Sequence, residues 1–259
     1  MIEEYPTEEG TKLLPFFTNY PYLKLLVEAI LKEKNGTILV DKREKPSVIL
    51  VKRKVLQFVN GDSTSKEAEA LIKHLEPNRL IIVPDKEWGE KLKEKWKEQL
   101  HTKIRTKFSS TELTRGCMQE IVKQLPDGLG IELLTKETIG TISEQASFII
   151  HILFSSLEDF LTRSFGFCIK DGGNIVSVAL AASPTYGKDY EIHIETDPGY
   201  QRRGLAMINS AKLIDYSLEK GLIPHWDADN EPSAKLAKKL KFIKPEHYET
   251  YFWSDKNEK

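Results

Sequence analysis

The chain has 259 residues and a formal net charge of −1, with 30% charged and 40% apolar residues. This length allows one large domain or two ordinary ones, each with a sizeable core. The near-neutral charge argues against a nucleic-acid or membrane partner. No apolar run approaches the roughly 20 residues that span a bilayer, and the acidic start is unlike a secretory signal. The only cysteines, Cys117 and Cys168, form neither a disulfide framework nor a zinc pattern. We therefore expect a reduced, cytoplasmic protein without a metal site.

The first part of the chain alternates helical and strand-like patterns. A helix is predicted over residues 12–34, with a break near Pro21 and an end at Asn35-Gly36. The elements that follow it are strands over 37–40, 47–51 and 55–59, a helix over 64–75, a strand over 80–83, a helix over 86–99 and a strand over 101–108. The turn at 60–65 contains a glycine but no arginine.

The second part repeats much of this order. Its predicted elements are a helix over 112–125, a strand over 131–134, two helical segments over 139–164, hairpin strands over 166–170 and 175–181, a strand over 190–195, a helix over 205–218, a strand over 223–227, a helix over 230–240 and strands over 242–253. Strand–helix–strand units favour parallel pairing, whereas hairpins are antiparallel. We therefore predict two similar α/β domains in tandem, residues 1–110 and 111–259. Each is expected to be a mixed, mostly antiparallel sheet flanked by helices.

The turn at residues 196–206 combines the features of a phosphate site. It follows a strand and opens a helix whose first turn holds Arg202, Arg203 and Gly204. A helix start leaves backbone N–H groups unpaired, and its dipole favours negative charge. Gly204 lets an anion approach the backbone closely, and the arginines add positive charge. The alternative is an ordinary solvated helix start after a Pro-Gly turn.

Two motifs make residues 189–242 resemble the GNAT superfamily of acyl-CoA-dependent N-acetyltransferases. The family's phosphate motif is Gln or Arg, two variable residues, Gly, a variable residue, then Gly or Ala, and it stands here as residues 201–206. Downstream, Asn230-Glu231-Pro232-Ser233, followed by Leu240 and Phe242, is similar to the family's helix after its fifth strand. The preceding Trp226-Asp227-Ala228 is similar to a bacterial branch of the family.

The resemblance implies that acetyl-CoA is the acyl donor. Backbone N–H groups in the motif would hold its pyrophosphate, and the backbone of the preceding strand would pair with its pantetheine amides. Asn230 would contact the pantetheine arm, with Ser233 near it. The residues assigned to the cofactor in this way are Ile194, Glu195, Thr196, Gln201, Arg202, Arg203, Gly204, Leu205, Ala206, Asn230 and Ser233.

Attack by an amine on a thioester requires a neutral amine, and hence a group that takes its proton. Glu191, His193 and Glu195 alternate on one face of the predicted strand. We favour Glu195 or Glu191 as the catalytic residue, each acting directly or through water. The alternative is that all three line a solvated wall. His225 and Tyr186 are further candidates, with structural roles as the alternative.

One of two departures from the resemblance bears on the chemistry; the other is Lys241, where the family often has glycine. Many family members carry a tyrosine that protonates the leaving thiolate, and Ala237 stands at that position here. Tyr200, a water molecule or unassisted departure are the remaining options.

The predicted activity is acetyl transfer to a primary amine of a small molecule or peptide, directly within a ternary complex. Residues 1–110 resemble a degenerate GNAT domain without the phosphate motif, which would wall the acceptor site. Neither nucleic acid nor membrane is expected as a partner, and a homodimer is left open. The rival hypothesis is a CoA-binding or regulatory module that has lost turnover.

Overall fold

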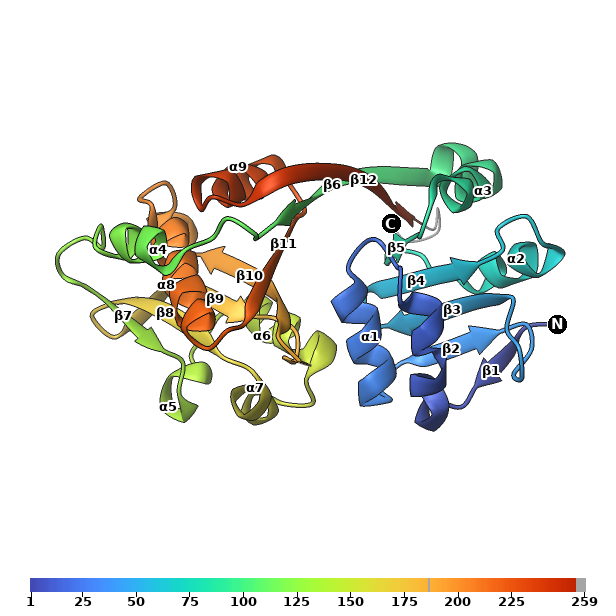
Figure 1. The fold of residues 1–259 in the computed structure, drawn as a ribbon, viewed down its shortest axis with the longest axis horizontal. Coiled ribbons are helices and arrows are strands. Elements are labelled where there is room, and N and C mark those ends of the chain that lie inside the picture. Colours follow the sequence, from blue (N-terminus) through green and yellow to red (C-terminus); the bar gives the residue numbers. More distant parts are fainter. Residues whose placement is uncertain (186, 255–259) are drawn as a thin grey trace. The chain divides into compact units, whose positions relative to one another are not determined.

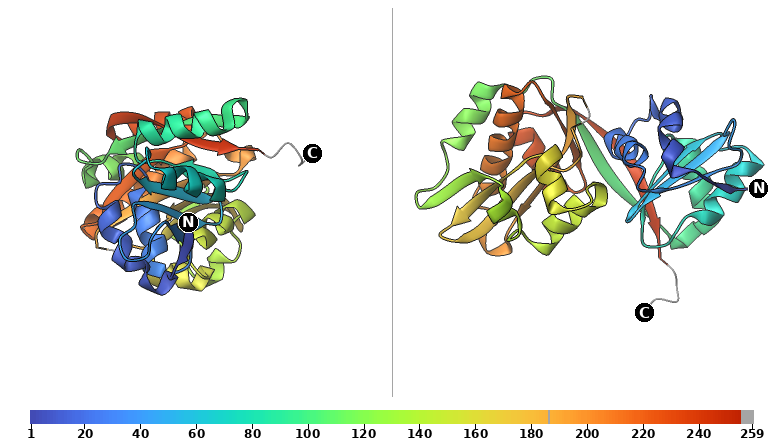
Figure 2. Two further views of the ribbon diagram at one scale, coloured as in Figure 1. Left: turned by 90° about the vertical axis from the view of Figure 1, so that its right-hand side faces the viewer. Right: turned by 90° about the horizontal axis from the view of Figure 1, so that it is seen from below.

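The computed structural model describes residues 1–185 and 187–254. These form two compact units, the first made of Met1–Arg105 and the residues from His247 onward, the second of Thr106–Glu246. Figures 1 and 2 show that each unit is a sheet with helices packed against it. Among the described strand pairs, β4–β5 and β10–β11 are parallel, and the other registers are antiparallel. The predicted mixed, mostly antiparallel α/β architecture is therefore confirmed.

The sheet of the first unit has the strand order β1-β2-β3-β4-β5-β12. Its elements in chain order are β1 (Glu3–Tyr5), a 3-10 helix (Thr7–Phe17), α1 (Lys24–Glu33), β2 (Thr37–Val40), β3 (Val48–Arg53), β4 (Leu56–Gly61), α2 (Lys66–Leu71), a 3-10 turn (Ile72–His74), β5 (Leu80–Ile82), α3 (Lys86–Trp96), a 3-10 turn (Lys97–Gln99), β6 (Leu100–Ser109) and the later strand β12 (Ile243–Trp253). Both β6 and β12 run from one unit into the other.

The first unit differs from the sequence-based expectation in three places. The break predicted near Pro21 is confirmed and α1 follows it, but the chain before the break is a 3-10 helix that begins at Thr7. β1 was not expected, since two of its three residues are exposed glutamates without an apolar alternation. The strands expected over 242–253 are one continuous strand, β12.

Trp88 lies in the apolar core of the first unit. Its side chain is fully buried, and its indole N–H donates to the carbonyl oxygen of Gly61 at 2.8 Å. Tyr251 packs in the same apolar cluster. Trp96 lies at the edge of this cluster, stacked on Trp253 with ring centroids 5.4 Å apart.

The sheet of the second unit has the order β6-β11-β10-β9-β8-β7. Its elements in chain order are α4 (Arg115–Val122), β7 (Leu129–Leu133), α5 (Lys136–Ile139), α6 (Glu144–Leu153), α7 (Leu157–Arg163), β8 (Gly166–Asp171), β9 (Asn174–Ala181), β10 (Asp189–Thr196), a 3-10 turn (Pro198–Tyr200), α8 (Leu205–Glu219), β11 (Ile223–Ala228) and α9 (Glu231–Lys239). One apolar cluster joins α4, α8 and α9 to the sheet, with Met118, Ile208 and Ala237 among its buried members.

Helix boundaries in the second unit follow their capping residues. The predicted break within residues 139–164 is confirmed, because Ser156 caps α7 by accepting the backbone N–H of Asp159 at 3.0 Å. Ser143 caps α6 in the same way, accepting the backbone N–H of Ala146 at 3.0 Å. The hairpin between β8 and β9 turns at Gly172, whose φ of +57° suits a glycine.

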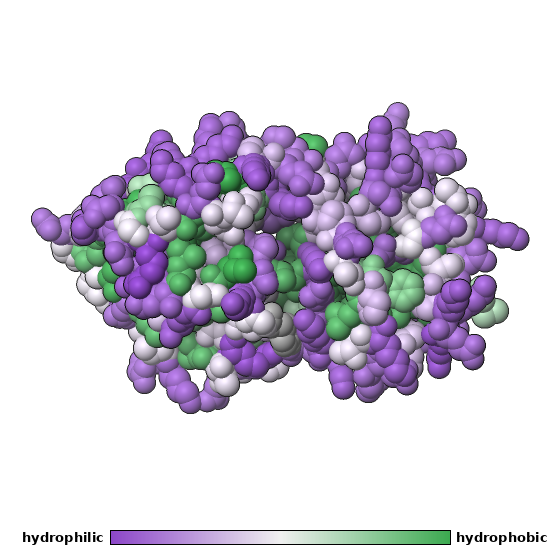
Figure 3. Space-filling view, in the orientation of Figure 1, coloured by the Kyte–Doolittle hydropathy of each residue, from purple (hydrophilic) through white to green (hydrophobic). Residues whose placement is uncertain are grey.

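The exterior is mainly polar. Figure 3 shows hydrophilic residues over most of the face in view, with apolar residues in smaller groups between them. Within residues 1–185 and 187–254, no helix is long and apolar enough to cross a bilayer. Of the two cysteines, Cys168 is buried as predicted, and burial raises the pKa of its thiol to about 11. Cys117 is partly exposed on α4.

Substitution of Gly61 tests the packing of the first unit. Gly61 has a φ of +106°, and an added Cβ would lie 2.0 Å from the carbonyl oxygen of Ser47. We expect Gly61→Ala to lower the free energy of unfolding by about 3 kcal/mol or more, since strain and overpacking add. Urea denaturation followed by tryptophan fluorescence measures this.

The control is Gly116→Ala on the exposed side of α4, where an added Cβ meets no atom within 4 Å. It should be neutral or stabilise by up to about 1 kcal/mol. Equal effects of the two substitutions would contradict the packing described for Gly61.

Candidate functional site

β10 and β11 lie side by side only where each begins. Their parallel register runs from Asp189 opposite Ile223 to Glu191 opposite His225, and the strands then diverge (Figure 1). On its other edge, β10 continues to pair with β9 over residues 192–196. In the described register, this part of β10 therefore has a strand partner on one edge only. An extended ligand can pair with such an edge as an added strand.

The turn from β10 into α8 leaves the start of a long helix open. Gly204 is the N-cap of α8, and no described side chain caps the helix. Arg202 and Gly204 have positive φ values of 61° and 82°. Left-handed residues in such turns gather backbone N–H groups into a concave anion site. A Cβ on Gly204 would meet no atom within 4 Å, so there is open space at this point. The turn therefore has the shape and polarity that a phosphate group requires.

Short contacts hold this turn in place. Asp197 accepts the backbone N–H of Gly199 at 2.8 Å, and the Gln201 side chain donates to the carbonyl oxygen of Thr196 at 3.2 Å. The guanidinium of Arg203 lies 4.8 Å from the ring centroid of Tyr200. One of the two arginines predicted for the site is thereby positioned by an aromatic ring.

Tyr200 connects the turn to the hairpin between β8 and β9. Its hydroxyl donates to Asp171 Oδ2 at 2.7 Å. This hydrogen bond to a carboxylate raises the pKa of the Tyr200 phenol above its usual value. The contact with Asp171 therefore stabilises the protonated phenol.

A buried amide fixes the end of β10 against α8. Asn209 is fully buried in α8, and its side chain donates to Ser177 Oγ and to the carbonyl oxygen of Phe167, both at 3.3 Å. Ser177 in turn donates to the carbonyl oxygen of Glu195 and lies 3.0 Å from Thr196 Oγ1. Ser177 of β9 therefore holds β10 on the edge opposite the unpaired one, and Asn209 of α8 holds Ser177.

The three titratable residues predicted on one face of β10 alternate with Ile192 and Ile194, which pack into the core beneath α8. His193 Nε2 and Glu195 Oε2 lie 4.0 Å apart. His193 and a hydrogen bond from Ser143 hold the pKa of Glu195 below its usual value, against the opposing effect of burial. Glu195 is therefore a carboxylate at neutral pH. Glu191 lies on the same strand, and its backbone N–H donates to Ser183 Oγ at 3.0 Å.

Asn230 and Ser233 lie at the junction of β11 and α9. Asn230 caps α9 by accepting the backbone N–H of Ser233 at 2.9 Å, and the Trp226 indole donates to Ser233 Oγ at 3.1 Å. Two motif residues are thus joined to the strand that separates from β10. Ala237 is fully buried in the core, so α9 presents only a methyl group there.

The two further candidates have different outcomes. His225 Nε2 lies 2.7 Å from Asp189 Oδ1, across the paired start of β10 and β11. This contact supports the structural role considered for His225. Tyr186 lies outside the residues that the structure describes.

In the first unit, the chain's own side chains occupy the equivalent place. The buried hydroxyl of Tyr20 lies 3.0 and 2.9 Å from the carbonyl oxygens of Val59 and Ile82, where the parallel pair of β4 and β5 ends. In the turn after β4, Asp62 Oδ1 accepts the backbone N–H of Thr64 at 2.9 Å. Asp197 does the same for Gly199 in the second unit, so the two turns begin alike. They differ at the helix start, where Ser65 caps α2 by accepting the backbone N–H of Ala68 at 3.1 Å, whereas no described side chain caps α8.

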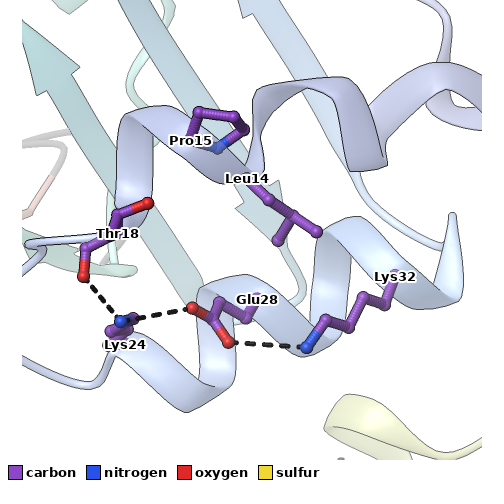
Figure 4. Close-up of a pocket in the computed structure, with 6 residues that line it drawn as sticks. All are labelled: Leu14, Pro15, Thr18, Lys24, Glu28 and Lys32. Carbon is purple, nitrogen blue, oxygen red and sulfur yellow. Dashed lines mark hydrogen bonds and ion pairs between the residues drawn. The ribbon is translucent and has the colours of Figure 1, made fainter.

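The first unit has a shallow hollow of about 320 Å³ (Figure 4). This hollow does not share the features of the candidate site in the second unit. Glu28 lies between Lys24 and Lys32, 3.5 Å from each ammonium nitrogen, and Lys24 also donates to the carbonyl oxygen of Thr18 at 2.6 Å. Its charges are largely paired with one another. Residues 1–185 and 187–254 contain no cluster of three His, Cys, Asp or Glu side chains suited to a metal ion.

Together, these features define a mixed α/β protein in which one strand leaves its parallel neighbour and leads towards an uncapped helix begun by glycine. Comparison with known proteins is consistent with this architecture. The GNAT acetyltransferase family model matches residues 16–251, so the chain belongs to that family.

Individual relatives are more distant. The uncharacterized N-acetyltransferase YdfB of Bacillus subtilis is 29% identical over 131 residues, which cover 50% of each protein. The chain thus spans about half the length of this curated relative. A GCN5-related N-acetyltransferase-like protein from Streptococcus suis has a TM-score of 0.79 at 24% identity, covering 96% of this chain and 99% of that one. A tandem GNAT protein from the clavulanic acid biosynthesis pathway has a TM-score of 0.62 at 12% identity, covering 97% and 98%. These likenesses confirm a fold of two GNAT-like parts in tandem.

Replacing Asp171 tests the contact that orients Tyr200. In Asp171→Asn the acceptor loses its charge, so the pKa of Tyr200 should fall towards its usual value of about 10. The contact stabilises the fold below the pKa of the unfolded chain, and this stabilisation is lost as the pH rises through the higher folded pKa. Tyrosinate absorbance, titrated with and without Tyr200→Phe, reports the change. An unchanged pKa would contradict the role of Asp171.

Proposed function

We propose that the protein is an N-acetyltransferase that transfers acetyl from acetyl-CoA directly to a primary amine in a ternary complex. One observation carries this proposal: β10 loses its β11 partner after Glu191 and leads directly into the uncapped start of α8. A single continuous segment thereby offers a strand edge for an extended arm and an N–H-lined turn for its phosphates. Membership in the GNAT acetyltransferase family supports the same reading.

The proposed donor site follows this segment. Backbone N–H groups over Gln201–Ala206 would hold the pyrophosphate, and Arg202 and Arg203 would add positive charge. The backbone of Ile194–Thr196 would pair with the pantetheine amides. Asn230 and Ser233, at the start of α9, would contact the arm from the β11 side. We assign this site to the domain of residues 111–259 and regard residues 1–110 as the degenerate domain.

The proposed chemistry uses the titratable face of β10. When bound, acetyl-CoA supplies an acetyl thioester, whose carbonyl is polarised by N–H donors aimed at its oxygen. Glu195 and Glu191 give this face a negative charge, which suits a protonated amine. Either carboxylate can accept the proton of the amine directly or through water. Tyr200 holds a proton at neutral pH and is the described phenol nearest in sequence to the phosphate motif of residues 201–206. The acceptor is a small-molecule or peptide amine.

A second function is favoured by one observation. Ala237 is buried where many family members carry a catalytic tyrosine, which would suit a CoA-binding module without turnover. Release of CoA thiol over a broad panel of primary amines separates the two. Steady release with any amine excludes the binding module, and tight acetyl-CoA binding without release over the whole panel excludes the enzyme.

Gly204→Glu tests the donor site. The new side chain would project a carboxylate into the open space at the start of α8 and would strain a residue with positive φ. We expect acetyl-CoA affinity, measured by calorimetry, to fall at least about 100-fold, since like charges meet at short range.

The matched control is Gly221→Glu just beyond the other end of α8. Gly221 also has a positive φ, +67°, and an added Cβ there also meets no atom within 4 Å. Gly221→Glu carries the same kind of strain and the same charge change, but it lies outside the proposed phosphate site. Acetyl-CoA affinity should therefore stay within about threefold. Unchanged binding in Gly204→Glu, or an equal loss in both variants, would overturn the proposed site.

A further inference from the structure

Two buried polar atoms on β10 have no hydrogen-bond partner within residues 1–185 and 187–254. They are His193 Nε2 and Glu195 Oε2, and they are 4.0 Å apart. Buried polar atoms are nearly always paired, and an exception calls for an explanation. A donor and an acceptor that lack partners and lie this close need only a small side-chain movement to bond to each other.

Glu195 is the fixed member of this pair. The Ser143 hydroxyl hydrogen-bonds its carboxylate, and Ser143 is itself held at the start of α6 by the backbone N–H of Ala146. Ser177 donates to the carbonyl oxygen of Glu195 and so fixes its backbone as well. The carboxylate is therefore held from the start of α6, and the backbone of the same residue from β9.

This arrangement selects one form of the neutral His193 ring. A carboxylate only accepts hydrogen bonds, so Glu195 stabilises the tautomer with its hydrogen on Nε2 and the lone pair on Nδ1. About 20% of the His193 side chain is exposed, although Nε2 itself is buried. The exposed part is therefore the remainder of the side chain, and not the nitrogen that faces Glu195.

We propose that His193 Nδ1 takes the proton of the acceptor amine and that Glu195 is a positioning residue acting through His193. This inference rests on the proposed acetyltransferase function and specifies the route of its proton. His193 lies in the part of β10 that has lost β11, two residues beyond the last parallel pair. It therefore lies along the strand edge that is proposed to pair with the pantetheine arm of acetyl-CoA. The carboxylate favoured from the sequence thus contributes indirectly.

The proton balance is complete without any further reagent. An ammonium group of the acceptor gives one proton to Nδ1, and the resulting imidazolium is stabilised by the Glu195 carboxylate. The freed nitrogen lone pair forms the bond to the acetyl carbon, and the carbon–sulfur bond breaks with its electron pair going to sulfur. The second proton lost by the nitrogen neutralises the thiolate, and His193 returns its proton to solvent.

The tautomer of His193 is measured by nitrogen-15 NMR of the full chain without ligand, with His193→Gln assigning the ring signals. We expect the neutral ring in the Nε2–H form, and a mixture of the two tautomers in Glu195→Gln, whose amide both donates and accepts. An Nδ1–H ring, or a tautomer unaffected by Glu195→Gln, would overturn the proposal.

Kinetics test the proton transfer with the amine that releases CoA fastest in the panel. We expect His193→Gln to lower kcat at least about 100-fold, with the acetyl-CoA Kd and the amine KM within about threefold. Glu195→Gln should lower kcat less, because the imidazole remains. His101→Gln, at an exposed position in the first unit, should leave kcat unchanged.

The two levels of the account fail differently. If His193→Gln keeps kcat within threefold while acetyl-CoA binds and thiol is released, the proton route is wrong and the acetyltransferase function stands. If acetyl-CoA does not bind the unaltered chain, both are overturned.

Discussion

The second unit depends on one interruption in backbone hydrogen bonding. β10 pairs with β11 only as far as Glu191, yet it pairs with β9 to its end at Thr196. An unpaired strand edge is costly when buried and prone to association when exposed, so a protein keeps one where it serves a purpose. Here the unpaired stretch runs without a break into the Gly204 turn. The other features of the site hold this segment in place.

The two units solve the same structural problem in opposite ways. Each has a single described parallel pair, β4–β5 or β10–β11, joined through a helix. In the first unit, Tyr20 fills the place where the strands part, and Ser65 caps the helix that follows. In the second unit the turn holds Arg202, Arg203 and Gly204, and no described side chain caps the helix. A duplicated scaffold is thus used once for packing and once as a candidate binding site.

Local patterns predicted most elements of the fold because their causes are local. Alternation predicted β10, and the predicted start of the helix over 230–240 coincides with Asn230, which caps α9. The three-residue strand β1 had no such pattern, and the unbroken course of β12 depends on pairing with distant strands. Chain order likewise does not encode that residues 247–254 pack with the first unit.

The candidate site divides in the same way. Its phosphate motif is contiguous in sequence, and the shared face of Glu191, His193 and Glu195 follows from strand periodicity. The contacts of Glu195 with Ser143 and of Tyr200 with Asp171 join segments far apart in the chain. Such contacts depend on how α6 and the β8–β9 hairpin pack on the sheet, and no sequence pattern predicts them.

Hydrogen–deuterium exchange with and without acetyl-CoA tests the central claim most directly, because it reads individual backbone amides along β10 and α8. The account predicts slower exchange on binding over Ile194–Thr196 and Arg202–Ala206, with the Asp62–Ser65 turn of the first unit unchanged. Protection confined to the first unit, or none over the β10–α8 segment at saturating acetyl-CoA, would contradict it.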